Sequence, residues 1–203
     1  MFFIVYIRSL LLLVLRFALR IGWRWWAAAA VVGLIAGALR MRFYGDETRE
    51  EKVRIISSGL FATYVVLVLA STVFVRKQTH MNHPINLDLF GTLARRLQFY
   101  SSNSYEVLLN VLLFVPIGFL LIAAVGWGRG KTVLVGLALS VTIELLQLAL
   151  SRGTCELSDV FTNTAGMLLG YSLFVVVRAA VLRTRSAGRL PNEEASHGRH
   201  RAQ

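Results

Sequence analysis

The chain has 203 residues, of which 56% are hydrophobic and 16% are charged, and its mean hydropathy is +0.60. An average soluble domain carries about 25% charged residues, so this composition indicates an integral membrane protein and excludes an ordinary water-soluble fold. The formal net charge of +11 does not indicate a nucleic-acid partner, because the Lys and Arg residues lie in short blocks between apolar runs. That arrangement is typical of the loops of a bilayer protein.

The apolar runs predict membrane-spanning α-helices. Each is continuous and close to the roughly 20 residues that cross a bilayer as a helix, and none has the alternating pattern of a lipid-facing β-strand. We therefore expect an all-α fold, a polytopic integral membrane helix bundle with five or six transmembrane helices. The expected spans are residues 2–19, 23–43, 55–75, 107–127, 132–150 and 161–177.

The run over residues 2–19 leaves two placements open. Arg8 and Arg16 interrupt it, and together with Arg20 and Arg24 they fall on one side of a helical wheel. The segment either packs this stripe inward or lies in the membrane interface. A cleaved signal peptide is disfavoured, because no positively charged region precedes the first apolar run.

The chain divides into three parts by composition. Residues 1–84 hold N-terminal membrane segments, residues 85–178 hold a membrane core, and residues 179–203 form a basic tail that is expected to be disordered at its end. Lys and Arg residues are more numerous on the side that holds the C-terminus, so the tail is expected to be cytoplasmic. The long connector ends in a capping-box spacing, Asn103 with Glu106, which predicts a helix that begins near Tyr105.

Metal and thiol chemistry are not expected. His80 and His83 form a His-x-x-His pair, but no clear third ligand beyond Asp88 accompanies them. Cys155 is the only cysteine, so it cannot form an internal disulfide, and no base stands beside it in the sequence. No cofactor is expected either.

Polar residues recur at helical spacing inside three of the expected spans. Glu144 and Gln147 share one face of their helix, as do Asp159 and Asn163. At 1.5 Å per residue, Asn110, Glu144 and Asn163 lie roughly 6 to 9 Å from the same membrane surface. A charge at that depth costs about 2.5 to 3.5 kcal/mol, so Glu144 is expected to belong to a functional site. With a cytoplasmic tail, the shared polar pocket would open outward.

Structural roles are the alternative for the other residues. Asp159 is placed to stabilise the dipole of its helix, and the amides Asn110, Gln147 and Asn163 could hydrogen-bond between helices. Gly166 and Gly170 have the spacing of small residues at a helix–helix contact. Pro116 with Gly118 is expected to bend its helix.

Arg152 is the expected partner of Glu144. The two are too far apart along a helix for direct contact, but Gly153 permits the loop to fold back. An arginine that returned over the pocket would neutralise the buried carboxylate. The sequence then predicts that Arg152→Ala abolishes function, and that Glu144→Gln combined with Arg152→Gln recovers folded protein without activity.

Two segments together resemble the VanZ-like family. "NVLLFVPIGFLL", which begins at Asn110, has its Asn and Phe-x-Pro-x-Gly pattern, and "LSVTIELLQLALSRGTCELSDVFTNTAGMLLG" has its Ser, Glu and Gln, then Arg, then Asp, Asn, Gly and Gly. The stretch "INLDLF" is similar to an Asn-Leu-x-x-Phe segment that often precedes them. The resemblance covers about residues 85–174. One departure is that the loop after Arg152 carries a single aspartate, Asp159, which argues against a second acidic role.

This resemblance implies a multi-pass protein of the bacterial cell membrane, in a family named for low-level resistance to the glycopeptide teicoplanin. The expected partners are membrane lipids and either a lipid-linked envelope precursor or a lipoglycopeptide bound in the pocket. Two other functions stay open. One is an enzyme on envelope lipids with Glu144 as general acid or base, and the other is a transporter, which the small number of spans disfavours. The family motif places the candidate site residues at Asn110, Glu144, Gln147, Arg152, Asp159 and Asn163.

Overall fold

The computed structural model describes residues 19–45, 48–76, 78, 85–97 and 104–187. These residues are almost entirely helical. The elements are α2 (Trp23–Tyr44), α3 (Arg49–Leu69), a π-helix (Ala70–Phe74), β1 (Ile85–Asn86), α4 (Leu89–Leu97), α5 (Ser104–Val125), α6 (Arg129–Ala149), β2 (Cys155–Glu156) and α7 (Leu157–Ala187).

The expected all-α membrane bundle is confirmed. Among the described residues, five helices are long and apolar enough to cross a bilayer, namely α2, α3 with its π-helical end, α5, α6 and α7. The helix expected near Tyr105 begins at Ser104. Several expectations concern residues outside the described part, namely the apolar run up to residue 18, Asn103, His80, His83 and the end of the basic tail.

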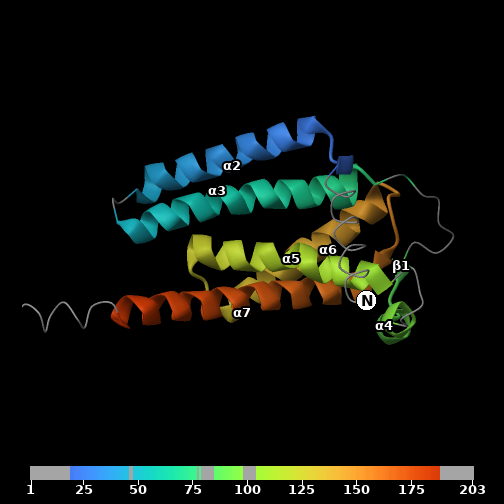
Figure 1. Cartoon of the computed structure of the whole chain (residues 1–203). Helices are drawn as coiled ribbons and strands as arrows, with labels where there is room; N and C mark the ends of the chain where they lie inside the picture. The colour runs from blue at the N-terminus through green and yellow to red at the C-terminus, as the bar shows by residue number, and fades with distance from the viewer. Residues whose placement is uncertain (1–18, 46–47, 77, 79–84, 98–103, 188–203) are drawn as a thin grey trace, which may run out of the picture.

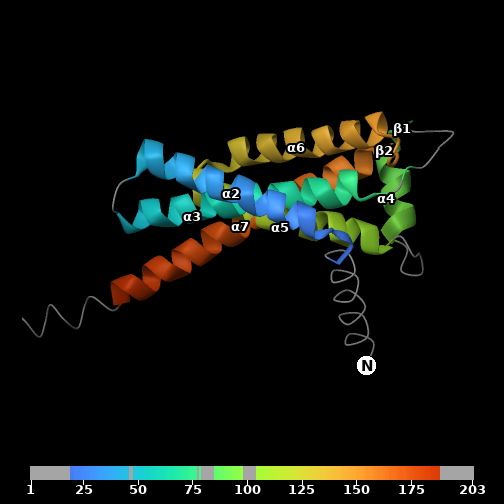
Figure 2. The same ribbon diagram turned by 90° about the horizontal axis from the view of Figure 1, so that it is seen from above.

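The long helices run side by side, as Figure 1 shows. Helices α2 and α3 form an antiparallel pair, α3 also packs on α5, and α5 packs along α7. Helix α6 packs mainly on α7, and the view from above in Figure 2 separates it from the α2–α3 pair. The apolar core therefore lies where α3, α5, α6 and α7 meet, and its buried members are Val68, Val73, Phe114, Ile117, Leu121, Ile143 and Met167.

Glycines set the close approach of α5 and α7. A Cβ atom added at Gly166 would overlap the carbonyl oxygen of Val111, and one added at Gly170 would overlap that of Val115. From the other helix, a Cβ at Gly118 would overlap the carbonyl oxygen of Met167. Pro116 lies inside α5, between these contacts. The two backbones thus touch where only hydrogen atoms fit, as in small-residue packing of membrane helices.

Short loop elements gather at one end of the bundle. Strand β1 pairs in parallel with β2, so that Ile85 stands opposite Cys155 and Asn86 opposite Glu156. This pairing joins the segment before α5 to the segment before α7, and α4 lies beside it in both views (Figures 1 and 2). The polar residues expected to lie at one depth are therefore close to the end covered by these loops.

The other element of this end is the π-helix that ends α3. Its N–H to C=O bonds skip one residue more than those of an α-helix, as in the 2.8 Å bond from the Val75 N–H to the Ala70 carbonyl. Such a turn leaves backbone carbonyls available to side chains from other helices. Two of them, on Thr72 and Phe74, accept hydrogen bonds from the α6 end of the candidate site.

Candidate functional site

A cavity of about 600 Å³ lies at the loop-covered end of the bundle. Its walls come from the ends of α3, α5, α6 and α7 and from the loops around β2. The structure places most of the residues singled out from the sequence on its lining, namely Asn110, Glu144, Gln147, Asp159 and Asn163. Arg152 is not among the lining residues.

Glu144 is buried inside the bundle, with only 2% of its surface exposed. Its Oε2 accepts a 2.8 Å hydrogen bond from the backbone N–H of Glu156 in β2. A carboxylate at this depth is costly unless it is hydrogen-bonded, and here a loop peptide group supplies the bond. The β1–β2 pairing fixes that peptide group in place, so the loop structure and the buried acid depend on one another.

Arg152 has a different role from the expected one. Its guanidinium donates to the backbone carbonyl oxygens of Phe74 and, at 2.7 Å, of Arg76. Within the described ranges no ion pair joins it to Glu144. The expectation that Arg152 neutralises Glu144 is therefore wrong. The freed carbonyls after the π-helix attract the guanidinium, and Arg152 fastens the end of α3 to the end of α6.

The side-chain amides of Gln147 and Asn163 differ in how their nitrogen and oxygen atoms are hydrogen-bonded. The Gln147 Nε2 donates to the Thr72 carbonyl at 3.1 Å, and the Asn163 Nδ2 donates to the Ser140 hydroxyl oxygen at 2.8 Å. Both side chains are at least 95% buried. Their oxygens, Gln147 Oε1 and Asn163 Oδ1, have no hydrogen-bond partner among the described residues. Since buried polar atoms are nearly always paired, these two oxygens mark the inner part of the cavity as a place for donors.

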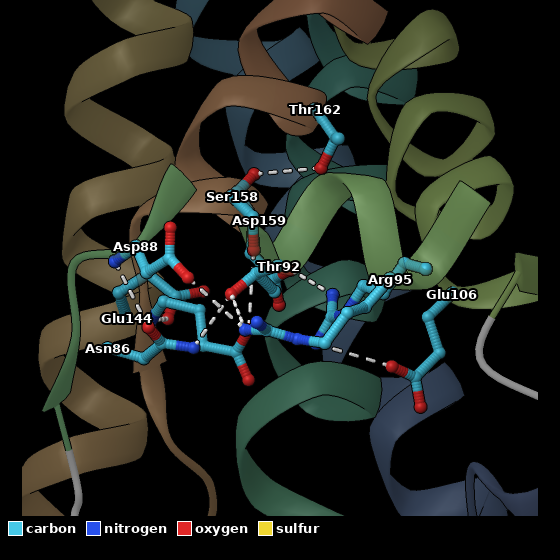
Figure 3. Close-up of polar contacts among 11 residues, drawn as sticks. Asn86, Asp88, Thr92, Arg95, Glu106, Glu144, Ser158, Asp159 and Thr162 are labelled. Atoms are coloured by element: carbon cyan, nitrogen blue, oxygen red, sulfur yellow. Dashed lines mark hydrogen bonds and ion pairs between the residues drawn. The ribbon is translucent and has the colours of Figure 1, made fainter. Parts of the chain in front are cut away.

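Arg96 of α4 joins three carboxylates from three other segments. It contacts Asp159 of α7 at 2.7 Å, Glu156 of β2 at 2.9 Å and Glu106 of α5 at 3.3 Å. Figure 3 labels Asp159 and Glu106 in this group, with Glu144 nearby. The Arg96 side chain is 12% exposed and the Glu106 side chain is 52% exposed, so the contacts to Glu156 and Asp159 are the better shielded ones.

Burial and charge shift the pKa values of this loop cluster. Burial raises the pKa of the Glu156 carboxyl, and the attraction of Arg96 only partly opposes that effect. Burial alone would lower the pKa of Arg96, but its three carboxylate neighbours raise it overall, so the guanidinium stays charged. Burial, with Glu144 and Glu156 nearby, also raises the pKa of the Cys155 thiol, which disfavours a thiolate nucleophile.

Arg96 and Glu156 were not found from the sequence as site residues. The argument against a second acidic role relied on Asp159 being the only aspartate after Arg152, and it is corrected by Glu156, whose carboxylate shares Arg96 with Asp159. A usable signal was present for Arg96. Leu89, Leu93 and Leu97 recur every four residues, which predicts a short amphipathic helix with a basic face.

A membrane-spanning helix bundle with a polar cavity at one end defines a multi-pass membrane protein. Within that class the chain matches the VanZ/LLP1 family over residues 59–178, more than half of its length, and it belongs to that family. It is similar to Protein VanZ of Enterococcus faecium, with 31% identity over 128 residues that cover 60% of this chain and 74% of that protein. No solved structure matches the chain.

Proposed function

We propose that this protein acts in the bacterial cell membrane by binding an amphiphile in the cavity, and that it thereby contributes to low-level resistance to teicoplanin-type glycopeptides. The bound molecule would be a lipid-linked envelope precursor or the acyl-bearing antibiotic itself. Either would lower the amount of drug that reaches its target. The family's association with teicoplanin supports the resistance, and the cavity supports the binding.

The observation that carries this proposal is the mixed chemistry of the cavity. Its most deeply buried polar residues are Glu144 and Gln147 of α6 and Asn163 of α7, whereas its α5 wall includes the apolar side chains of Leu109, Leu112 and Phe114. Leu112 is also 40% exposed on a helix that is long and apolar enough to span the membrane. A ligand with a polar head and an acyl chain would satisfy both parts, since its chain could lie along α5 among the lipids.

The proposed side of access follows from the charge of the loops. The positively charged tail is expected in the cytoplasm, which would place the loop-covered end of the bundle at the outer surface. Lipid-linked wall components and glycopeptides both occur on that side. The cavity would then meet its ligand without transporting it.

Drug susceptibility of a Gram-positive host tests this function. We expect expression of the protein to raise the inhibitory concentration of teicoplanin more than that of vancomycin, which lacks an acyl chain. Glu144→Gln should remove the effect at an unchanged protein level, because it alters the buried acid next to β2. Thr142→Ala is the matched control, because Thr142 is exposed on the same helix and bonds only to the Ala138 carbonyl. Unchanged inhibition by both drugs would eliminate the resistance function.

An enzyme acting on envelope lipids is the second candidate. The observation that favours it is the unlike setting of two nearby acids, because Glu144 is buried on a peptide N–H whereas Asp159 is paired with Arg96. Two carboxylates held in different environments can serve as acid and base. Incubation of the purified protein with labelled envelope lipids separates the two functions, since only an enzyme changes the mass of its ligand.

A further inference from the structure

The buried part of the cavity presents two unpaired amide oxygens and a carboxylate. Gln147 and Asn163 each donate one N–H, to Thr72 and to Ser140, and their oxygens line the cavity without a partner among the described residues. Glu144 adds a carboxylate one helical turn from Gln147. A buried acceptor that stays unsatisfied costs about 1 to 3 kcal/mol, so a ligand that donates hydrogen bonds here is strongly favoured.

The arginines of the cavity lining are either paired or exposed, although Arg76 also attracts the Glu144 carboxylate. Arg96 is held by three carboxylates, and the remaining lining arginines, Arg20 and Arg76, are exposed. A phosphate that reached the buried end would therefore face Glu144 and two amide oxygens, all of which repel it. The acceptors also come from two helices, α6 and α7, so they suit several donors spread over a ring better than a single ammonium group.

From this placement we infer that the cavity takes an uncharged, hydroxyl-rich headgroup, a glycosyl group carried on an acyl chain, in preference to a phosphate headgroup. This inference rests on the proposed binding function and narrows it to one chemical class. Hydroxyl groups of the sugar would donate to Gln147 Oε1 and Asn163 Oδ1, while the acyl chain follows the α5 wall past Leu112.

Lipid retention by the full-length protein tests the inference. The protein is reconstituted in phosphatidylcholine nanodiscs that contain equal mole fractions of monoglucosyl diacylglycerol, phosphatidic acid and phosphatidylethanolamine with the same acyl chains. Native mass spectrometry then counts the lipids that remain bound after release from the disc. We expect the glucosyl lipid to be retained about tenfold more than phosphatidic acid, which corresponds to about one buried acceptor satisfied.

Two substitutions at Asn163 separate ligand binding from packing. Asn163→Leu removes both the acceptor and the Nδ2 donor, whereas Asn163→Asp keeps an acceptor oxygen and replaces the Nδ2 donor to Ser140 with an acidic oxygen. If the oxygen binds the sugar, the Leu variant should lose the preference about tenfold while the Asp variant retains it. If Asn163 serves only to hold Ser140, both variants should behave alike. Thr142→Ala, on the exposed face of α6, should match the unmodified protein.

The inference is overturned if phosphatidic acid or phosphatidylethanolamine is retained as well as the glucosyl lipid, if none of the three is retained, or if both Asn163 variants behave alike, whether they keep the preference or lose it. Its failure is distinguishable from failure of the proposed function. Teicoplanin resistance without glycosyl preference would reject the headgroup class alone. A glycosyl preference without any change in drug inhibition would reject the resistance alone.

Discussion

The backbone N–H of Glu156 donates a 2.8 Å hydrogen bond to Oε2 of Glu144, although the two residues belong to different elements of the loop-covered end. The buried acid of α6 is thus held by a peptide group of β2, and among the described residues it forms no salt bridge. Because β2 is in turn paired with β1, the environment of Glu144 depends on a segment that precedes α5. Substitutions in the loops are therefore expected to affect the cavity.

The energetic coupling between Glu144 and Arg152 should be small. Arg152 binds the carbonyls of Phe74 and Arg76, so it shares no partner with Glu144. We expect the losses in thermal stability of Glu144→Gln and Arg152→Gln to add within about 0.5 kcal/mol in the double variant. Thermal unfolding of the four proteins in one detergent measures this. Recovery of stability in the double variant would instead support the direct pairing of Glu144 and Arg152 that was expected from the sequence.

Loss of Arg96 should destabilise the loop-covered end. Arg96→Met leaves Glu106, Glu156 and Asp159 without their shared cation, and we expect the stability to fall by about 2 to 3 kcal/mol. Arg95→Met is the matched control, because Arg95 and its partner Asp88 are both mostly exposed and such pairs contribute about 0 to 1 kcal/mol. Equal melting temperatures for the two variants would show that the Arg96 cluster does not stabilise the fold.

Glu156 predicts a specific pH dependence. Burial raises the pKa of its carboxyl above the ordinary 4.5, so between these two values the folded protein binds more protons than the unfolded chain. The contribution of Glu156 to stability therefore falls as the pH rises through that window. Since Glu156→Gln cannot ionise, the melting temperature of the variant minus that of the unmodified protein should increase with pH above 4.5. A difference that decreases over the same range would contradict the shift.

The spans were predictable because a continuous apolar run indicates each membrane helix without reference to the rest of the chain. The apolar runs located five helices, although α3 begins six residues earlier and α7 ends ten residues later than expected. The helical spacing placed Glu144 and Gln147 on one face, where both are buried. The partner of Glu144 was not predictable, because the Glu156 peptide reaches it only through the β1–β2 pairing of two distant segments. The same holds for the ion pairs of Arg96, whose acidic partners come from three elements.

Bulk at the α5–α7 contact should be poorly tolerated. Gly170→Ala would bring a Cβ atom against the carbonyl oxygen of Val115, and we expect a loss of about 1 to 3 kcal/mol as the helices separate. Gly130→Ala is the control, because nothing lies within 4 Å of a Cβ atom there. That variant should be neutral or slightly stabilising, since alanine favours the helix. Melting temperatures in detergent compare the two, and a neutral Gly170→Ala would refute the close packing.

The side of the membrane that the cavity faces can be measured with reporter fusions. We expect a phosphatase fused after Ser186 to be inactive, because the positive charge near α7 predicts a cytoplasmic C-terminus. The same enzyme inserted in the connector between α5 and α6 should also be inactive, since that turn lies at the same end of the bundle as the end of α7 (Figure 1). Activity at both positions would show that the protein has the opposite orientation, with the cavity facing the cytoplasm.

The π-helix is the feature of α3 that composition could not reveal. Residues 70–74 include Ser71 and Thr72 after a wholly aliphatic run, but no proline or glycine marks the change to a π-helix. Its carbonyls instead accept hydrogen bonds from other segments, at Thr72 from Gln147 of α6 and at Phe74 from Arg152 of the loop after α6. Such tertiary determination of a local turn cannot be read from a window of sequence.

The short β1–β2 pairing also sets the order in which this protein can be completed during synthesis. Strand β1 leaves the ribosome before α5, but its partner β2 follows only after both α5 and α6 have been made. Helices α5 and α6 are therefore made before the peptide group that holds Glu144. Until β2 has been made, a nascent chain carries that acid without its peptide partner, so we expect a chain that ends after α6 to be less stable than one that continues through β2.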